Sequence, residues 1–266
     1  MTGGEFSNGT VKPKFYYYPT RAAATGVPAF DVVNDCISRL GLSKQFAPVI
    51  DFFAANPHYN ATPEFVGVEG LSHERNRFKV YVRIGAAYSS LNEVVRITSL
   101  DGTLKHPNVN ETIVTFTRLW RLLCPGRDDG EVVPSLRPGG RGMLIYFELG
   151  HNREEVIPKI YVPCYRFEGT DDHVAGAITQ YHRLYNQGGD VEKNYETHFK
   201  AMLCVYFDEC SAGEAVADSR SWHYSTGFNL RQKFPVIHSY IGIATKNGNT
   251  QMTIYYVLDV FGVANS

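Results

Sequence analysis

The stretch Asn76-Arg77-Phe78-Lys79-Val80-Tyr81-Val82-Arg83-Ile84 alternates between two kinds of side chain, and the fold can be worked out from it. Successive side chains of a β-strand point to opposite faces. One face would therefore carry Arg77, Lys79, Tyr81 and Arg83, and the other Phe78, Val80, Val82 and Ile84. The pattern predicts a strand with one cationic, tyrosine-bearing face and one apolar face.

The same pattern recurs at distant points of the chain. Lys14-Phe15-Tyr16 and Lys159-Ile160-Tyr161 repeat the spacing of Lys79-Val80-Tyr81, and Thr253-Ile254-Tyr255 is a weaker copy. If these strands lie side by side in the same phase, their lysines and tyrosines line one cationic, aromatic interior. That interior is the candidate site.

Length and composition bound the class of protein. The 266 residues are 44% hydrophobic, which is enough for a large core, and we expect a single domain over 1–266 with a flexible, Gly-rich segment at 1–10. Lys and Arg number 26 against 27 Asp and Glu. This balance gives no basic field for nucleic acid or for an anionic membrane surface.

Five scattered cysteines without a Cys-x-x-Cys pair argue against a disulfide framework and a zinc site, and they favour a reducing cytoplasm. The start at Met1 lacks the features of a signal peptide, and no run approaches 18 apolar residues. We therefore expect a cytoplasmic protein without a membrane partner. The sequence leaves the oligomeric state open, with a homodimer as one alternative.

Periodicity and turn residues predict the order of the elements. Hydrophobic residues at helical spacing predict helices over 28–40 and 44–55, two more before Pro125 with Asn110 as the cap of the second, and others that begin at Asp171 and Asp190. The predicted strands are 11–18, 64–69, 76–84, 142–148, 157–162, 236–244 and 251–258. Asn247-Gly248-Asn249 is a strong hairpin turn signal between the last two strands.

This order repeats a strand pair followed by two helices. It predicts an α+β fold in which an antiparallel sheet grows two strands at a time, with helices over its apolar face. If the sheet curls, its Lys/Arg/Tyr face becomes the lumen of a β-barrel. The first strand, 11–18, has no predicted partner before it, so we expect the barrel to be incomplete.

The cationic face suggests a ligand. A single lysine on a strand is most often a solvated surface residue. Lys14, Arg77, Lys79 and Lys159 in one lumen would repel each other unless an anion lay among them, and a diphosphate would supply that anion. Each charge-assisted hydrogen bond contributes roughly 1.5–3 kcal/mol, and a tyrosine face stabilises a dehydrated cation by about 2 kcal/mol.

The sequence shows no cofactor motif. Asp128-Asp129 and Asp171-Asp172 lack the further carboxylate at helical spacing that a magnesium-diphosphate site needs, so turn or cap roles are favoured. No metal-binding histidine pattern, P-loop, GxGxxG or GxSxG occurs. Gly139-Gly140-Arg141-Gly142 precedes a strand and is interpreted as a loop. We therefore expect no metal or other cofactor.

At these residues the chain resembles the fungal aromatic (indole) prenyltransferases of the dimethylallyltryptophan synthase family. The matching pieces are Lys14–Pro19, Asn76–Arg83, Leu119–Leu123, Pro158–Pro163, Gly169–Asp172 and Ser239–Gly242, in family order over nearly the whole chain. The resemblance implies an antiparallel barrel ringed by helices. It also implies transfer of a dimethylallyl group from dimethylallyl diphosphate to an indole or tryptophan-derived acceptor in alkaloid secondary metabolism, without metal.

The resemblance further implies site residues. Lys14, Arg77, Lys79 and Lys159 would bind the prenyl diphosphate, and Tyr16, Tyr81, Tyr161 and Tyr240 would shield the allyl cation. Lys159 stands where many relatives carry Gln, and Ala244 where some carry a second tyrosine. Family members have a longer N-terminal portion with an acidic residue near the acceptor. Glu5 lies in a stretch that only weakly resembles the one around that acidic residue, and a loose terminus is the ordinary interpretation.

Two further interpretations remain beside the enzyme. A truncated, weakly active or inactive remnant would keep the diphosphate-binding strands without the acceptor half, and the short N-terminal portion favours it. A lipocalin-like binding barrel is disfavoured because lysines would line its lumen. The catalytic residues, the acceptor, the prenyl chain length and the ring position attacked are not predicted by the sequence.

Overall fold

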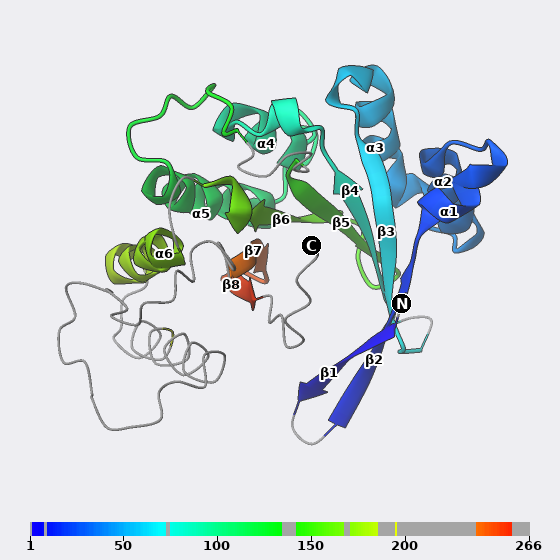
Figure 1. The fold of residues 1–266 in the computed structure, drawn as a ribbon. Coiled ribbons are helices and arrows are strands. Elements are labelled where there is room, and N and C mark those ends of the chain that lie inside the picture. Colours follow the sequence, from blue (N-terminus) through cyan, green and yellow to red (C-terminus); the bar gives the residue numbers. More distant parts are fainter. Residues whose placement is uncertain are drawn as a thin grey trace, which may run out of the picture.

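The computed structural model describes residues 2–7, 10–72, 75–134, 142–167, 171–185, 195 and 238–256. Within these residues, eight strands form one antiparallel sheet in which each strand pairs with the next along the chain. They are β1 (Thr2–Ser7), β2 (Thr10–Tyr17), β3 (Thr62–Glu69), β4 (Arg77–Arg83), β5 (Leu144–Gly150), β6 (Ile157–Pro163), β7 (His238–Lys246) and β8 (Asn249–Tyr256). The sheet curves into part of a barrel (Figure 1).

Helices lie between the strand pairs, as the sequence predicts. The α-helices are α1 (Pro19–Ala22), α2 (Ala29–Arg39), α3 (Ser43–Ala55), α4 (Leu91–Thr98), α5 (Pro107–Leu123) and α6 (Asp171–Tyr185). Short 3₁₀ turns are η1 (Ala23–Thr25), η2 (Pro57–Tyr59), η4 (Ala86–Tyr88) and η5 (Cys164–Arg166). The helix expected from Asp190 lies outside the described residues except for Tyr195.

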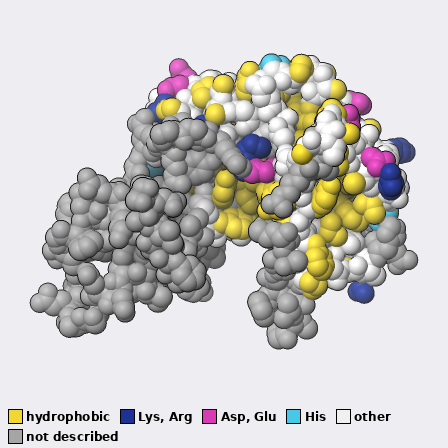
Figure 2. Space-filling view, turned by 45° about the vertical axis from the view of Figure 1, so that its right-hand side comes forward, with side chains coloured by type: hydrophobic (Ala, Val, Ile, Leu, Met, Phe, Trp, Pro, Cys, Tyr) yellow, Lys and Arg dark blue, Asp and Glu magenta, His cyan; other side chains and the backbone are white. Residues whose placement is uncertain are grey.

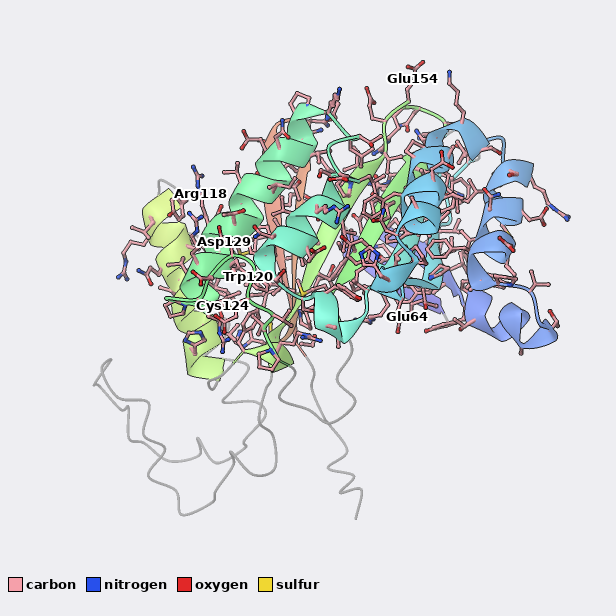
Figure 3. All side chains as sticks on the ribbon, turned by 90° about the horizontal axis from the view of Figure 1, so that it is seen from above. Glu64, Arg118, Trp120, Cys124, Asp129 and Glu154 are labelled. Carbon is pink, nitrogen blue, oxygen red and sulfur yellow. The ribbon has the colours of Figure 1, made fainter. Side chains whose placement is uncertain are left out.

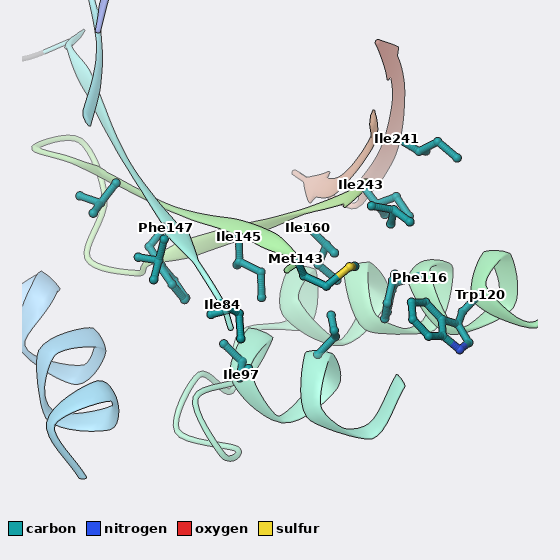
Figure 4. Packing of buried hydrophobic residues seen from close by; sticks show 14 of the residues in the cluster. Ile84, Ile97, Phe116, Trp120, Met143, Ile145, Phe147, Ile160, Ile241 and Ile243 are labelled. Atoms are coloured by element: carbon teal, nitrogen blue, oxygen red, sulfur yellow. The ribbon is translucent and has the colours of Figure 1, made fainter. Parts of the chain in front are cut away.

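The convex face of the sheet packs on the helices. Phe78, Val80 and Val82 of β4 are 0–5% exposed, and they belong to the main hydrophobic cluster. Figure 4 shows Ile145 and Ile160 of the sheet directed toward the helices that carry Ile97 and Phe116. The apolar half of the alternating pattern therefore forms the core, which leaves the polar half on the concave face.

The outer helices also contact one another. Figure 3 shows α5 and α6 side by side, with Arg118 and Trp120 labelled on α5 and Cys124 directly after its last residue. The Arg118 guanidinium lies 4.6 Å from the centre of the Tyr185 ring on α6. Trp120 packs edge-on against Phe167, with ring centres 6.0 Å apart. These contacts hold the helical layer together behind β6 and β7.

The N-terminal residues correct the sequence analysis. We expected a flexible segment at 1–10 and a strand at 11–18 without a preceding partner, but β1 pairs with β2 from Thr2↔Phe15 to Ser7↔Thr10. Gly3 and Gly4 have low strand propensity, which hid this strand. Pairing to a neighbouring strand outweighs such a local preference.

The start of α5 is a second correction. We expected Asn110 to cap it, but the N-cap is His106, whose ring nitrogen accepts a hydrogen bond from the Asn108 amide. Pro107 occupies the first turn, where its missing N–H costs nothing. The final turn is as predicted: Asn247 and Gly248 have φ of 51° and 75°, as a two-residue hairpin turn requires.

A buried hydrogen bond joins the helical layer to the sheet. The Thr245 amide of β7 donates to the Thr112 hydroxyl of α5 over 2.8 Å, and that hydroxyl donates to the Asn108 carbonyl over 2.8 Å. Thr112 and Thr245 are both fully buried. The Thr245 N–H therefore depends on this one side chain.

We predict that Thr112→Val lowers the free energy of unfolding by about 1–3 kcal/mol, the cost of leaving a buried donor unsatisfied. Urea denaturation of the purified chain measures the change. Thr117→Val, at a half-buried position of the same helix, is the control and should change stability by less than about 0.5 kcal/mol. Equal effects at the two positions would show that the link to β7 contributes nothing.

Candidate functional site

The register of the sheet brings the polar half of each strand onto one concave face. One row across the strands is Tyr16, Gly67, Lys79 and Glu148; the next contains Phe65, Tyr81, Tyr146 and Lys159; a third contains Arg83, Leu144, Tyr161, Gly242 and Thr253. Along each strand these residues alternate with the apolar residues that face the core. Figure 2 shows a basic and an acidic group side by side, with hydrophobic side chains below them on the surface of the molecule.

Aromatic rings form the middle of this face. Tyr81, Leu144, Tyr146 and Tyr161 are buried as a cluster separate from the main core, with Tyr16, Phe65, Tyr240 and Tyr255 packed against it. The ring of Tyr81 stacks on Phe65 at 4.1 Å and meets Tyr146 at 5.1 Å and Tyr161 at 5.8 Å. Burial raises the pKa of the Tyr81 and Tyr161 hydroxyls above their usual range. These residues therefore present neutral rings.

Cationic side chains occupy one end of the face, where Glu69 binds two of them. Arg77 donates to both Glu69 oxygens at 2.6–3.0 Å, and the Lys79 ammonium donates to Oε1 at 2.7 Å. Burial acts to raise the pKa of Glu69, but the hydrogen bonds from Lys79 and Arg77 outweigh it and lower the pKa to about 2. Lys14, half-buried on β2, is the cross-strand neighbour of Glu69.

Glu148 is a second internal carboxylate, and it is fully buried. The Lys246 ammonium lies 2.7 Å from its Oε2, and Arg153 and Arg77 lie 3.0 and 3.8 Å from its Oε1. Burial acts to raise the pKa of Glu148, but Lys246, Lys79 and Arg77 lower it overall. A buried carboxylate with this many cationic neighbours stays ionised.

Lys159 differs from the other cations because hydroxyls and rings surround its ammonium group. It donates to the Thr253 hydroxyl at 3.1 Å and the Tyr255 hydroxyl at 3.5 Å, and it lies 5.2 Å from the Tyr161 ring centre. Burial first, and then repulsion from Lys246 and Lys79, lower the pKa of Lys159 to about 8. A Cβ on Gly242 would lie 2.5 Å from the Lys159 Cε, so the glycine provides the space for this side chain.

The structure therefore brings all the sequence-predicted site residues to one face: Lys14, Tyr16, Arg77, Lys79, Tyr81, Lys159, Tyr161 and Tyr240. The sequence analysis expected an anion among these cations and named a diphosphate, and the structure places two carboxylates of the chain itself, Glu69 and Glu148, among them. Sequence reasoning missed these two carboxylates, and it also missed Tyr146 and Lys246. For Tyr146 and Glu148 the sequence contains one signal: they are two positions apart on one predicted strand, so their side chains share a face.

Within the described ranges, no three His, Cys, Asp or Glu side chains are grouped as metal ligands. In that same part of the chain, no helix is both long enough and apolar enough to cross a membrane. Asp129, which the sequence analysis assigned to a turn, pairs with Arg121 at 3.4 Å on the surface. It therefore lies in an exposed ion pair.

A curved antiparallel sheet with outer helices and a polar, tyrosine-rich concave face defines the barrel class of the aromatic prenyltransferases. AnaPT from Neosartorya fischeri superposes on 97% of this chain and 56% of its own, with a TM-score of 0.68 and 18% identity. The 6-dimethylallyltryptophan synthase from Micromonospora olivasterospora, solved with DMASPP and Trp, superposes on 96% of this chain and 60% of its own with a TM-score of 0.64 and 15% identity. These structures show the fold.

The sequence pattern of the tryptophan dimethylallyltransferase family matches residues 1–198, and the chain belongs to that family. A 7-dimethylallyltryptophan synthase of Aspergillus fumigatus is 24% identical over 263 residues, which cover 95% of this chain and 50% of that protein. An indole diterpene prenyltransferase of Hypoxylon pulicicidum is 22% identical over 218 residues, which cover 76% and 50%. The chain spans about half the length of these curated relatives.

The lowered pKa of Glu69 generates a prediction about acid stability. A carboxylate with a lowered folded-state pKa stabilises the fold above its unfolded pKa, near 4.3, and this contribution is lost as the pH falls toward about 2. Glu69→Gln should therefore be less stable than the wild type at pH 7, and the difference should shrink between pH 5 and pH 2.5. Urea titrations across this range measure it.

Glu155→Gln, a change of the same kind on an exposed loop, is the control. Its stability against urea should depend on pH in the same way as that of the wild type. If the difference between Glu69→Gln and the wild type stayed constant with pH, Glu69 would not be the ionised partner of Arg77 and Lys79.

Proposed function

We propose that this chain is an aromatic prenyltransferase that transfers a dimethylallyl group from dimethylallyl diphosphate to an indole or tryptophan-derived acceptor in alkaloid secondary metabolism. The observation that carries the proposal is the order of groups along the concave face, in which a cationic end adjoins a group of tyrosines. We call Tyr16, Tyr81, Tyr146, Tyr161, Tyr240 and Tyr255 the tyrosine wall. The relatives named as dimethylallyltryptophan synthases support the reaction class. The structure with DMASPP and Trp supports the two substrate classes.

In this proposal Lys14, Arg77, Lys79 and Lys159 bind the diphosphate. The allylic C–O bond breaks, its electron pair leaves with the diphosphate, and the cations stabilise that leaving group. Tyr16, Tyr81, Tyr161 and Tyr240 surround the allyl cation with π faces and limit its contact with water. A ring carbon of the acceptor then forms the new C–C bond, and the ring releases its proton to the departed diphosphate or to water.

The proposed reaction needs no metal, because the cationic side chains supply the charge that Mg²⁺ supplies elsewhere. Glu69 is held by Arg77 and Lys79 before the donor arrives, so a diphosphate must share or replace these contacts. The Arg77 side chain is 33% exposed, which leaves it accessible to such a ligand.

We further propose that 1–266 acts as one domain. The free thiols of Cys124 and Cys164 support a reducing, cytoplasmic location, and a homodimer stays a sequence expectation.

Pyrophosphate binding to the purified chain tests the donor half of the proposal. We expect calorimetry to detect binding with and without EDTA, and Lys79→Ala to weaken it by roughly 1.5–3 kcal/mol, the range for one charge-assisted contact. Tyr81→Phe should leave the affinity nearly unchanged because it keeps the ring. Arg39→Ala, at a side chain that is 79% exposed on α2, is the control. Binding that disappears in EDTA would refute the metal-free site.

Turnover tests the transfer step. Within the described residues β8 does not pair with β1, and water that reached the concave face would quench the allyl cation. We expect the 266-residue chain, given dimethylallyl diphosphate and a panel of indoles, to form a prenylated product at well below about 1 s⁻¹. Mass spectrometry detects the product. Donor binding without any product would favour the remnant interpretation.

A further inference from the structure

A second, accessible ion pair lies at the other end of the tyrosine wall. Arg83 of β4 donates from Nε to Oε2 of Glu64 at 2.7 Å, and its NH2 nitrogen lies 2.6 Å from the same oxygen. The side chains of Arg83 and Glu64 are 15% and 20% exposed, whereas that of Glu148 is completely buried. A ligand on the concave face could therefore reach the Glu64–Arg83 pair.

An irregularity in β3 accompanies this pair. The register between β3 and β4 shifts between Pro63 and Phe65, so that Glu64 is an extra residue opposite β4. Such bulges redirect a side chain and are frequent next to active sites. Here the bulge lets Glu64 reach Arg83 while Phe65 stacks on Tyr81. The carboxylate is thereby held beside the aromatic cluster.

Arg83 is fixed by its other contacts. Its NH1 nitrogen donates to the Gly142 carbonyl at 3.1 Å and to the Tyr240 hydroxyl at 3.2 Å. Together with the contacts to Glu64, these occupy four of the five N–H groups that a guanidinium carries. Arg83 therefore has little capacity left to bind a carboxylate of a substrate.

The two ends of the face differ in charge. Lys14, Arg77, Lys79, Arg153, Lys159 and Lys246 gather with two carboxylates at the proposed donor end, among the residues that the structure describes. At the other end the negative charge of Glu64 offsets the positive charge of Arg83. Arg83 lies four positions after Lys79 on β4, a distance of about 13 Å along an extended strand. Tyr81 lies between the two ends on β4, and its ring contacts those of Phe65, Tyr146 and Tyr161.

We propose that Glu64, positioned by Arg83, binds the polar end of the acceptor's side arm and selects indoles with an ammonium group there over indoles with a free carboxylate. The inference rests on the proposed function, because it assumes that an aromatic acceptor lies on the tyrosine wall. An ammonium group at Glu64 gains a charge-assisted hydrogen bond. A carboxylate there meets a negative charge and an arginine that is already engaged.

The acceptor preference can be measured by binding alone, with tryptamine and indole-3-propionate as probes. They share the indole ring and a two-carbon arm, and they carry opposite charges at neutral pH. We expect the full 266-residue chain to bind tryptamine at least tenfold more tightly in calorimetry. Glu64→Gln should reduce tryptamine affinity by about tenfold or more and narrow the preference, since it removes the charge but keeps the shape.

Glu154→Gln is the matched control, because Glu154 is exposed and lies on the opposite side of the molecule from Glu64 (Figure 3). It should leave both affinities unchanged. Pyrophosphate affinity, measured in parallel, reports on the donor site and should be the same in all three proteins.

Equal binding of the two probes by the wild type, or tighter binding of indole-3-propionate, would overturn the inference even if Glu64→Gln failed to fold. A loss of tryptamine affinity that is equal in Glu64→Gln and Glu154→Gln would also overturn it. If neither indole bound while pyrophosphate did, the acceptor inference would fail and the donor half of the proposed function would stand. Loss of pyrophosphate binding as well would refute the proposed function itself.

Discussion

The concave face depends on one constraint: cations gathered on the inside of a curved sheet need anions among them. Coulomb repulsion between unit charges a few ångströms apart grows as water is excluded. Glu69 and Glu148 meet this need from within the chain, each in contact with at least two basic side chains. Because these carboxylates offset part of the positive charge, the basic residues can stay charged before any ligand is present.

The tyrosine wall follows from the same arrangement. Side chains alternate along each strand, so Lys14, Lys79 and Lys159 each have a tyrosine two positions further on, on the same face of the sheet. Among the described residues the helices pack on the convex face, where Phe78, Val80 and Val82 are buried. The apolar side fixes the register, and the register in turn fixes which polar groups meet. The same alternating pattern therefore determines both the hydrophobic core and the residues of the candidate site.

Much of this could be predicted from the sequence. The period-two pattern of 76–84 and its copies at Lys14 and Lys159 indicated the sheet, its phase and the residues that share its inner face. Three features could not be predicted, for physical reasons. The Gly-rich β1 is a strand only because β2 pairs with it. The cap of α5 depends on the geometry of His106 and not on the stronger intrinsic preference of Asn110. Glu69 and Glu148 each need partners from other strands, so no local pattern reveals their role.

The bulge in β3 has a consequence for how related chains are compared. A strand has a period of two, so one inserted or deleted residue moves every side chain beyond it to the opposite face. At Glu64 the chain departs from strict alternation by one residue. Relatives that lack this extra residue would present a different side chain beside Arg83 even where their alignment looks continuous. Variation in length at this point, more than substitution, could therefore change the charge of this end of the barrel.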